Sequence, residues 1–172
     1  MSAPTVGTSA EPATEPATGL DGPPPAGLRW AHLALNCRDQ QVTEQFYERW
    51  FGFRRARAVT LPDGAQIIFV RQGDVLLELF AAEGDGESAA ADGPRRPGTA
   101  RHLAFQTDDL DGFLARMADQ AHVSLGPLSF DAFIPGWRSV WLYDPDGVVV
   151  EVSQGYRDED HSPSPQEACH VG

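Results

Sequence analysis

The sequence predicts an α+β fold in which one βαβββ unit occurs twice, and two pairs of similar segments predict it. The segments His32–Leu35 and His102–Phe105 both place a histidine in front of an apolar run. Further along each half, Gly73–Leu79 and Asp146–Val152 both carry a glutamate among aliphatic residues. Internal similarity of this kind is typical of duplicated structural units, whose equivalent strands can face one another. Each half therefore contributes one histidine and one glutamate.

The composition fits a single domain with a sizeable core, since the chain has 172 residues of which 41% are hydrophobic. With 13 basic against 25 acidic residues and a net charge of -12, a nucleic-acid partner is not expected. All the basic residues are arginines, which excludes lysine Schiff-base chemistry and a phosphate-loop lysine. The sequence has no apolar run long enough to span a membrane and no leader-like N-terminal segment. We therefore expect a cytoplasmic protein without a membrane partner.

Composition also predicts the limits of the folded part. Residues 1–27 consist largely of Pro, Ala, Thr, Gly and Glu and are expected to form a disordered tail, and the polar residues 156–172 a second tail. The two cysteines form no disulfide framework, and Cys37 is expected to be a buried small side chain. The folded part is then divided into repeat one (28–81), a linker (82–98) and repeat two (99–155).

In repeat one, hydrophobic alternation and turn residues predict a strand, a helix and three strands. Asp39 is a plausible N-cap for the helix and Gly52 ends it. The expected elements are a strand at Arg29–Cys37, a helix at Val42–Phe51, and strands at Phe53–Thr60, Gln66–Arg71 and Asp74–Phe80.

Repeat two shows the same order of patterns. Its last two strands are expected to form a hairpin around Asp144–Gly147, because Pro and Gly stand at successive turn positions. The expected elements are a strand at Arg101–Thr107, a helix at Leu110–Ala118, a strand at Val123–Phe130, and the hairpin strands Trp137–Tyr143 and Val148–Ser153.

Glu78 and Glu151 each stand in mid-strand between aliphatic neighbours, where an unpaired carboxylate costs several kcal/mol, roughly. Taken alone, each glutamate side chain could point to solvent, and the histidine of each half could be an ordinary hydrogen-bonded residue. As two matching pairs, His32, Glu78, His102 and Glu151 are better explained as ligands of one divalent metal ion. Nitrogen and oxygen donors suit Zn, Ni, Co, Mn or Fe, and four protein ligands leave positions open for substrate oxygens.

The paired units, the segments Gln45–Tyr47 and Phe51–Phe53, and the run Tyr143–Glu151 with its DPDG turn resemble the vicinal oxygen chelate superfamily. This superfamily contains the glyoxalase I, bleomycin-resistance and dioxygenase-like proteins. The four residues of the proposed metal set match the family's ligands one for one. The resemblance implies a curved mixed sheet around the metal, a small-molecule substrate and often a homodimer. Whether the ligands meet in one chain or across a dimer stays open.

The resemblance also implies an enzyme that moves a proton next to a carbonyl group, as an isomerase, epimerase or lyase. Glu151 is the first choice for the base, with Glu78 acting on the opposite face. Asn36 and Ala82 replace an Arg and an Asn of bacterial glyoxalase I, so glutathione is not the expected cosubstrate. An Fe(II)-dependent dioxygenase and a small-molecule-binding or antibiotic-sequestering protein are the alternatives.

Four residues are candidates for substrate binding. Asn36 and Gln106 are expected on the same strand faces as His32 and His102, although they could equally satisfy local backbone groups. Trp141 could wall the cavity or simply pack in the core. Arg138 is the cation expected to anchor an anionic substrate.

Overall fold

The computed structural model describes residues 29–84 and 90–159. The predicted tail at 1–27, most of the tail at 156–172 and Cys169 lie outside the described residues. The described residues from Ala31 onward belong to one compact unit. No helix in the described ranges is long and apolar enough to span a bilayer.

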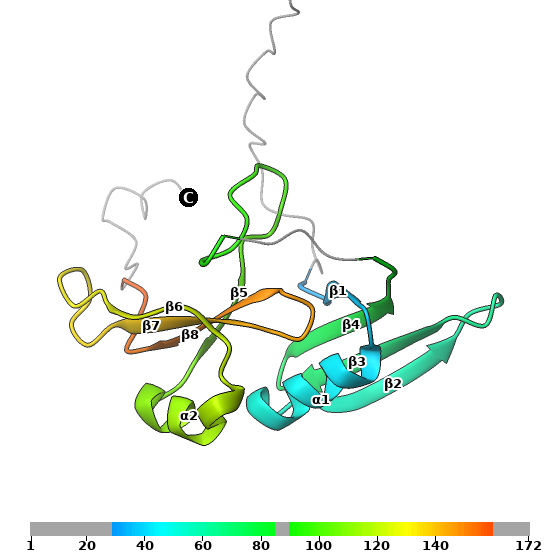
Figure 1. The fold of residues 1–172 in the computed structure, drawn as a ribbon, viewed down its shortest axis with the longest axis horizontal. Coiled ribbons are helices and arrows are strands. Elements are labelled where there is room, and N and C mark those ends of the chain that lie inside the picture. The colour runs from blue at the N-terminus through cyan, green and yellow to red at the C-terminus, as the bar shows by residue number, and fades with distance from the viewer. Residues whose placement is uncertain (1–28, 85–89, 160–172) are drawn as a thin grey trace, which may run out of the picture. The chain divides into compact units, whose positions relative to one another are not determined.

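Each repeat folds as a four-stranded mixed sheet with one main helix (Figure 1), so the predicted α+β class with two βαβββ units is confirmed. Repeat one contains β1 (Leu33–Cys37), α1 (Gln40–Phe51), β2 (Arg54–Thr60), β3 (Gln66–Gln72) and β4 (Val75–Ala81). Repeat two contains β5 (Leu103–Gln106), α2 (Leu110–Met117), the short 3-10 helix η1 (Ala118–Gln120), β6 (Val123–Ser129), β7 (Arg138–Tyr143) and β8 (Val149–Gln154).

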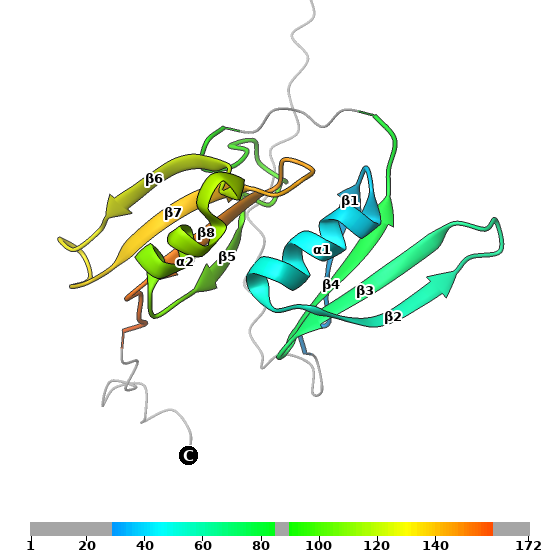
Figure 2. The same ribbon diagram turned by 60° about the horizontal axis from the view of Figure 1, so that its bottom comes forward.

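The two sheets have the same topology (Figures 1 and 2). The strand orders are β1-β4-β3-β2 and β5-β8-β7-β6, with a parallel pair at the edge and antiparallel pairs elsewhere. In each sheet the first strand of the repeat therefore lies directly beside its last strand. This pairing places the segment that follows each histidine against the strand that carries each glutamate.

Helix α1 begins and ends where its capping residues predict. The Asp39 carboxylate accepts hydrogen bonds from the backbone N–H groups of Gln41 and Val42 at 2.9 and 3.3 Å. Gly52 ends the helix at φ 72°, a left-handed conformation that glycine adopts at little cost. Tyr47 on the inner side of the helix is fully buried.

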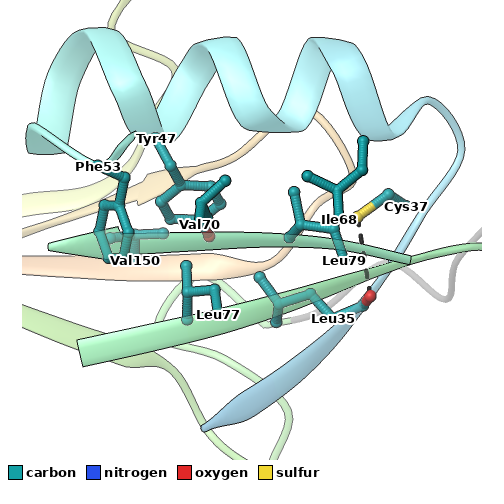
Figure 3. Close-up of a cluster of buried hydrophobic side chains, with 9 residues drawn as sticks. All are labelled: Leu35, Cys37, Tyr47, Phe53, Ile68, Val70, Leu77, Leu79 and Val150. Carbon is teal, nitrogen blue, oxygen red and sulfur yellow. Dashed lines mark hydrogen bonds between the residues drawn. The ribbon is translucent and has the colours of Figure 1, made fainter. Parts of the chain in front are cut away.

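Figure 3 shows the core that holds α1 on its sheet. Alternate residues of the strands point toward the helix, and burying each large aliphatic side chain contributes about 1.5–3 kcal/mol. Cys37 is buried here, as predicted, and burial raises the pKa of its thiol to about 11. The buried members are Leu35, Cys37, Tyr47, Phe53, Ile68, Val70, Leu77, Leu79 and Val150. Since Val150 belongs to β8, repeat two contributes to the core of repeat one.

The DPDG turn of repeat two docks on α1 of repeat one. The Tyr47 hydroxyl donates a hydrogen bond to Asp144 at 3.0 Å, and the Thr43 hydroxyl donates one to Asp146 at 2.5 Å. The backbone N–H of Arg38 also donates to Asp146, at 2.8 Å. Asp144 is only 5% exposed, and burial raises the pKa of its carboxyl to about 6. The polar contacts of this turn therefore join the repeats, in addition to the packing of Val150 in the core of repeat one.

Candidate metal centre

The histidine and glutamate of repeat one lie together on the face of the sheet opposite α1. Parallel pairing sets Ala34 beside Glu78, and His32 precedes Ala34 by two residues, so it shares the same face. His32 Nε2 is 3.0 Å from Glu78 Oε2. The His32 side chain is 42% exposed and the Glu78 side chain 13% exposed, so this pair is accessible from solvent.

Repeat two has the same geometry. Ala104 pairs with Glu151, and His102 stands two residues before Ala104. His102 Nε2 is 2.9 Å from Glu151 Oε2, with side-chain exposures of 23% and 12%. We call the face of each sheet that carries such a pair its site face. The duplicated topology therefore produces two equivalent His–Glu pairs.

Two contacts hold the pair of repeat two in place. The Ser139 hydroxyl donates a hydrogen bond to Glu151 Oε1 at 2.7 Å, and His102 Nδ1 lies 3.1 Å from the carbonyl oxygen of Asp92. A proton on Nδ1 satisfies that carbonyl and leaves the Nε2 lone pair for a ligand bond. Sequence reasoning missed both contacts, although alternation along β7 places Ser139 on the face of Trp141.

The pairs fit the donor requirements of a transition-metal ion. Imidazole nitrogen and carboxylate oxygen both bind such ions at about 2.1 Å, and two such donors at a right angle are about 3.0 Å apart. The observed separations of 3.0 and 2.9 Å match that value. An ordinary His–carboxylate hydrogen bond has similar dimensions, so the spacing permits a shared ion without requiring one.

The two pairs do not converge into one cluster within a single chain. Among residues 29–84 and 90–159, no group of three or more His, Cys, Asp or Glu side chains is close enough to hold a metal ion. Each repeat thus brings together two of the four candidate ligands.

Strand register defines a row of residues across each site face. In repeat one the row runs Arg57, Phe69, Glu78 and Ala34 from β2 to β1. In repeat two the equivalent row runs Leu125, Trp141, Glu151 and Ala104. Each glutamate therefore has an aromatic side chain as its direct neighbour across the sheet.

Trp141 has an unusual environment for a buried indole. It is 7% exposed, its ring centroid lies 6.4 Å from that of His102, and its Nε1 has no hydrogen-bond partner among the described residues. Leaving a buried donor unsatisfied costs about 1–3 kcal/mol. The sequence-based assignment of Trp141 to the site is compatible with this placement beside Glu151 and His102.

The other substrate-binding candidates differ in their placement. Asn36 lies on the site face of β1 and, with His102, lines a cavity of about 580 Å³. Gln106 lies on the site face of β5 opposite Ser153, four residues beyond His102. Arg138 does not fit its predicted role. It lies three positions before Trp141, on the helix side of β7, and its guanidinium donates two 2.9 Å hydrogen bonds to Asp111 of α2.

Comparison with solved structures supports the fold. A glyoxalase family protein from Enterococcus faecalis is 27% identical with a TM-score of 0.57, covering 73% of this chain and 97% of that one. A glyoxalase/dioxygenase from Nostoc punctiforme is 22% identical (TM-score 0.59; 81% and 100% covered). A mutant of the Listeria monocytogenes fosfomycin resistance protein FosX, in complex with Mn(II) and 1S,2S-dihydroxypropylphosphonic acid, is 18% identical (TM-score 0.57; 74% and 93% covered).

One curated protein also matches. The fibrillarin-like rRNA/tRNA 2'-O-methyltransferase of Pyrobaculum calidifontis is 25% identical over 108 residues, which are 63% of this chain and 46% of that protein. The chain thus spans less than half the length of this relative. The family model of the Glyoxalase/Bleomycin resistance protein/Dioxygenase superfamily, by contrast, matches residues 29–152, nearly the whole of both repeats. The chain belongs to the Glyoxalase/Bleomycin resistance protein/Dioxygenase superfamily.

Proposed function

We propose that this protein is a metal-dependent enzyme that transfers a proton next to a carbonyl group of a small substrate with neighbouring oxygens. The observation that carries the proposal is the pair of equivalent His–Glu sites, His32 with Glu78 and His102 with Glu151. These four residues would hold the ion, and their nitrogen and oxygen donors suit Zn, Ni, Co, Mn or Fe. Family membership and the Mn(II) complex of the FosX mutant support this assignment.

The bound ion would act as a Lewis acid that stabilises negative charge on a substrate oxygen. The chain itself must then supply the base. Glu151 was the first choice on sequence grounds, but its Oε1 is held by Ser139 at 2.7 Å. Glu78 has His32 as its only side-chain partner among the described residues, and the side chain of His32 is 42% exposed against 23% for His102. We therefore assign Glu78 to proton transfer, with Glu151 as the fixed ligand and Ser139 as its positioning residue.

We further propose that the complete site forms in a homodimer. Repeat one of one copy would supply His32 and Glu78, and repeat two of the other copy would supply His102 and Glu151. Two copies related by two-fold symmetry would then form two equivalent sites. The separation of the two pairs within one chain supports this arrangement, since each pair alone leaves an ion with only two protein ligands.

Metal analysis of mixed dimers tests both statements. Glu78→Gln damages repeat one only, and Glu151→Gln damages repeat two only. In a mixed dimer of these variants, a site shared between copies pairs the intact halves once, so half of the wild-type metal content is restored. Sites within single chains would remain damaged in both copies, and restoration would not occur. A wild-type protein that takes up no divalent metal would overturn the proposal of a metal enzyme.

Isotope exchange tests the type of reaction. During turnover in deuterated water, the carbon next to the substrate carbonyl should gain deuterium. Glu78→Gln and Glu151→Gln should both abolish this exchange, since each removes a proposed metal ligand and Glu78→Gln also removes the proposed base. Oxygen consumption that requires Fe(II), without such exchange, would instead identify a dioxygenase. Either result separates the two reaction classes.

A further inference from the structure

A β-bulge in β2 turns an arginine toward the site face of repeat one. Arg55 pairs with Val70 and Arg57 pairs with Phe69, so β2 has one extra residue, Ala56, at this point. Arg55 lies on the helix side, where its Nε donates a 2.6 Å hydrogen bond to Glu44 of α1. Regular alternation would return Arg57 to that same side. The bulge places Arg57 on the site face instead, a known use of bulges beside functional sites.

Arg57 then lies in the row that contains Glu78. Its direct neighbour is Phe69, whose other neighbour is Glu78, so the Cα atoms of Arg57 and Glu78 are about 10 Å apart, two strand spacings. Arg71 follows Phe69 by two residues and lies on the same face. Arg57, Phe69 and Arg71, together with Ala56 and Leu76, line a cavity of about 390 Å³.

The charges of these two arginines are not neutralised by the described part of the protein. No ion pair or hydrogen bond joins Arg57 or Arg71 to another side chain in residues 29–84 and 90–159, whereas Arg55 and Arg138 are both paired with carboxylates. Arg54, the third arginine facing β3 here, is paired with Glu48. In a chain with a net charge of -12, two adjacent cations without acidic partners form a local site for an anion.

Repeat two has the same bulge with a different residue. The register of β6 also gains one residue between Val123 and Leu125, and Leu125 then pairs with Trp141 in the row of Glu151. The position equivalent to Arg57 is thus aliphatic. Only repeat one presents a cation at this place in the duplicated fold.

We propose that Arg57 and Arg71 bind an oxyanion group of the substrate, a carboxylate, phosphate or phosphonate, while Phe69 contacts its apolar part. This inference rests on the proposed function, because it takes the substrate to react beside Glu78. The substrate class is therefore a small organic anion whose charged group lies about 10 Å or less from the reacting carbon, the span from Arg57 to Glu78. The anchor is on β2 and β3 of repeat one, not at Arg138.

The test measures anion binding to metal-free protein, so that it does not depend on the metal site. Inorganic phosphate and phenylphosphonate are titrated at constant ionic strength, and binding is followed by calorimetry and by the NMR signals of the Phe69 ring. We expect both anions to bind, phenylphosphonate more tightly. Arg57→Gln and Arg71→Gln should each weaken binding about fivefold, and the double variant should weaken it more than about tenfold.

Arg138→Gln is the matched control, since it removes the same charge from the other sheet and should bind phosphate like the wild type. Absence of binding to the wild type overturns the inference, as does equal weakening by Arg138→Gln or unchanged binding to the double variant. The metal content of the double variant is measured in parallel and should be unchanged. If the wild-type protein binds these anions but takes up no divalent metal, the proposed function is refuted and the anion site stands.

Discussion

Replacing Asp144 with asparagine should remove a defined part of the pH dependence of stability. Asp144 lies in the turn that joins the repeats, and its carboxylate accepts hydrogen bonds from the backbone N–H groups of Asp146 and Val148 at 2.9 and 2.8 Å and from Tyr47. Asparagine has nearly the same shape. Its oxygen can accept the two backbone hydrogen bonds, and its amide can donate to the Tyr47 hydroxyl, but it cannot ionise.

The size of the effect follows from the pKa of Asp144. Burial raises this pKa to about 6 in the folded protein, despite the hydrogen bonds that favour the carboxylate. In the unfolded chain an aspartate has a pKa of about 3.9. The folded state therefore retains a proton that the unfolded state releases, and stability falls as the pH rises from about 4 to about 6. The loss between pH 4 and pH 7 amounts to about 2 kcal/mol, because the unfolded carboxyl is already about half ionised at pH 4.

Urea denaturation of metal-free wild type and Asp144→Asn at a series of pH values measures this difference. The variant should lose about 2 kcal/mol less than the wild type between pH 4 and pH 7, while other titrating groups contribute equally to both proteins. Tyr47→Phe is the control that keeps the carboxyl group and removes its donor. It should lower the free energy of unfolding and keep the pH dependence. Parallel stability curves for wild type and Asp144→Asn would refute the reasoning.

Three further predictions concern the candidate site. Ser139→Ala frees the Glu151 carboxylate and should weaken metal binding about tenfold in competition with a chromophoric chelator; unchanged affinity would contradict the positioning role of Ser139. Trp141→Phe removes a buried donor without a described partner, so in metal-free protein its cost in urea denaturation should be below about 1 kcal/mol. Zinc should raise the Tm of the wild type but not of Glu151→Gln, and an equal rise in both would place the bound ion elsewhere.

The fold could be predicted from the sequence because its local signals agree with one another. The Asp39 cap, the Gly52 stop and the alternation in β3 and β4 each fix an element within a few residues of its observed bounds. The duplication then fixes the order of the strands, since the second set of patterns repeats the first. The expected placement of Glu78 and Glu151 follows from period-two alternation, which depends on the backbone alone.

The positions of Arg57 and Arg138 could not be predicted in the same way. A single extra residue in β2 reverses the face of Arg57, and the bulge at Ala56 has no distinct sequence signal such as a glycine. Arg138 has the charge that an anion anchor needs, but it is paired with Asp111 of α2, 27 positions earlier in the chain. Alternation locates side chains on a regular strand, whereas bulges and long-range ion pairs depend on the tertiary structure.

The divergence between the two repeats has a functional meaning under the proposed dimer. Ser139, which holds Glu151, corresponds by register to Ile67 in repeat one, which cannot hold Glu78. Arg57 corresponds to Leu125. A site built from one repeat of each kind would therefore combine a fixed carboxylate and an apolar wall with a freer carboxylate and two cations. Identical repeats could not divide binding, positioning and proton transfer in this way, so the asymmetry would orient the substrate between the halves.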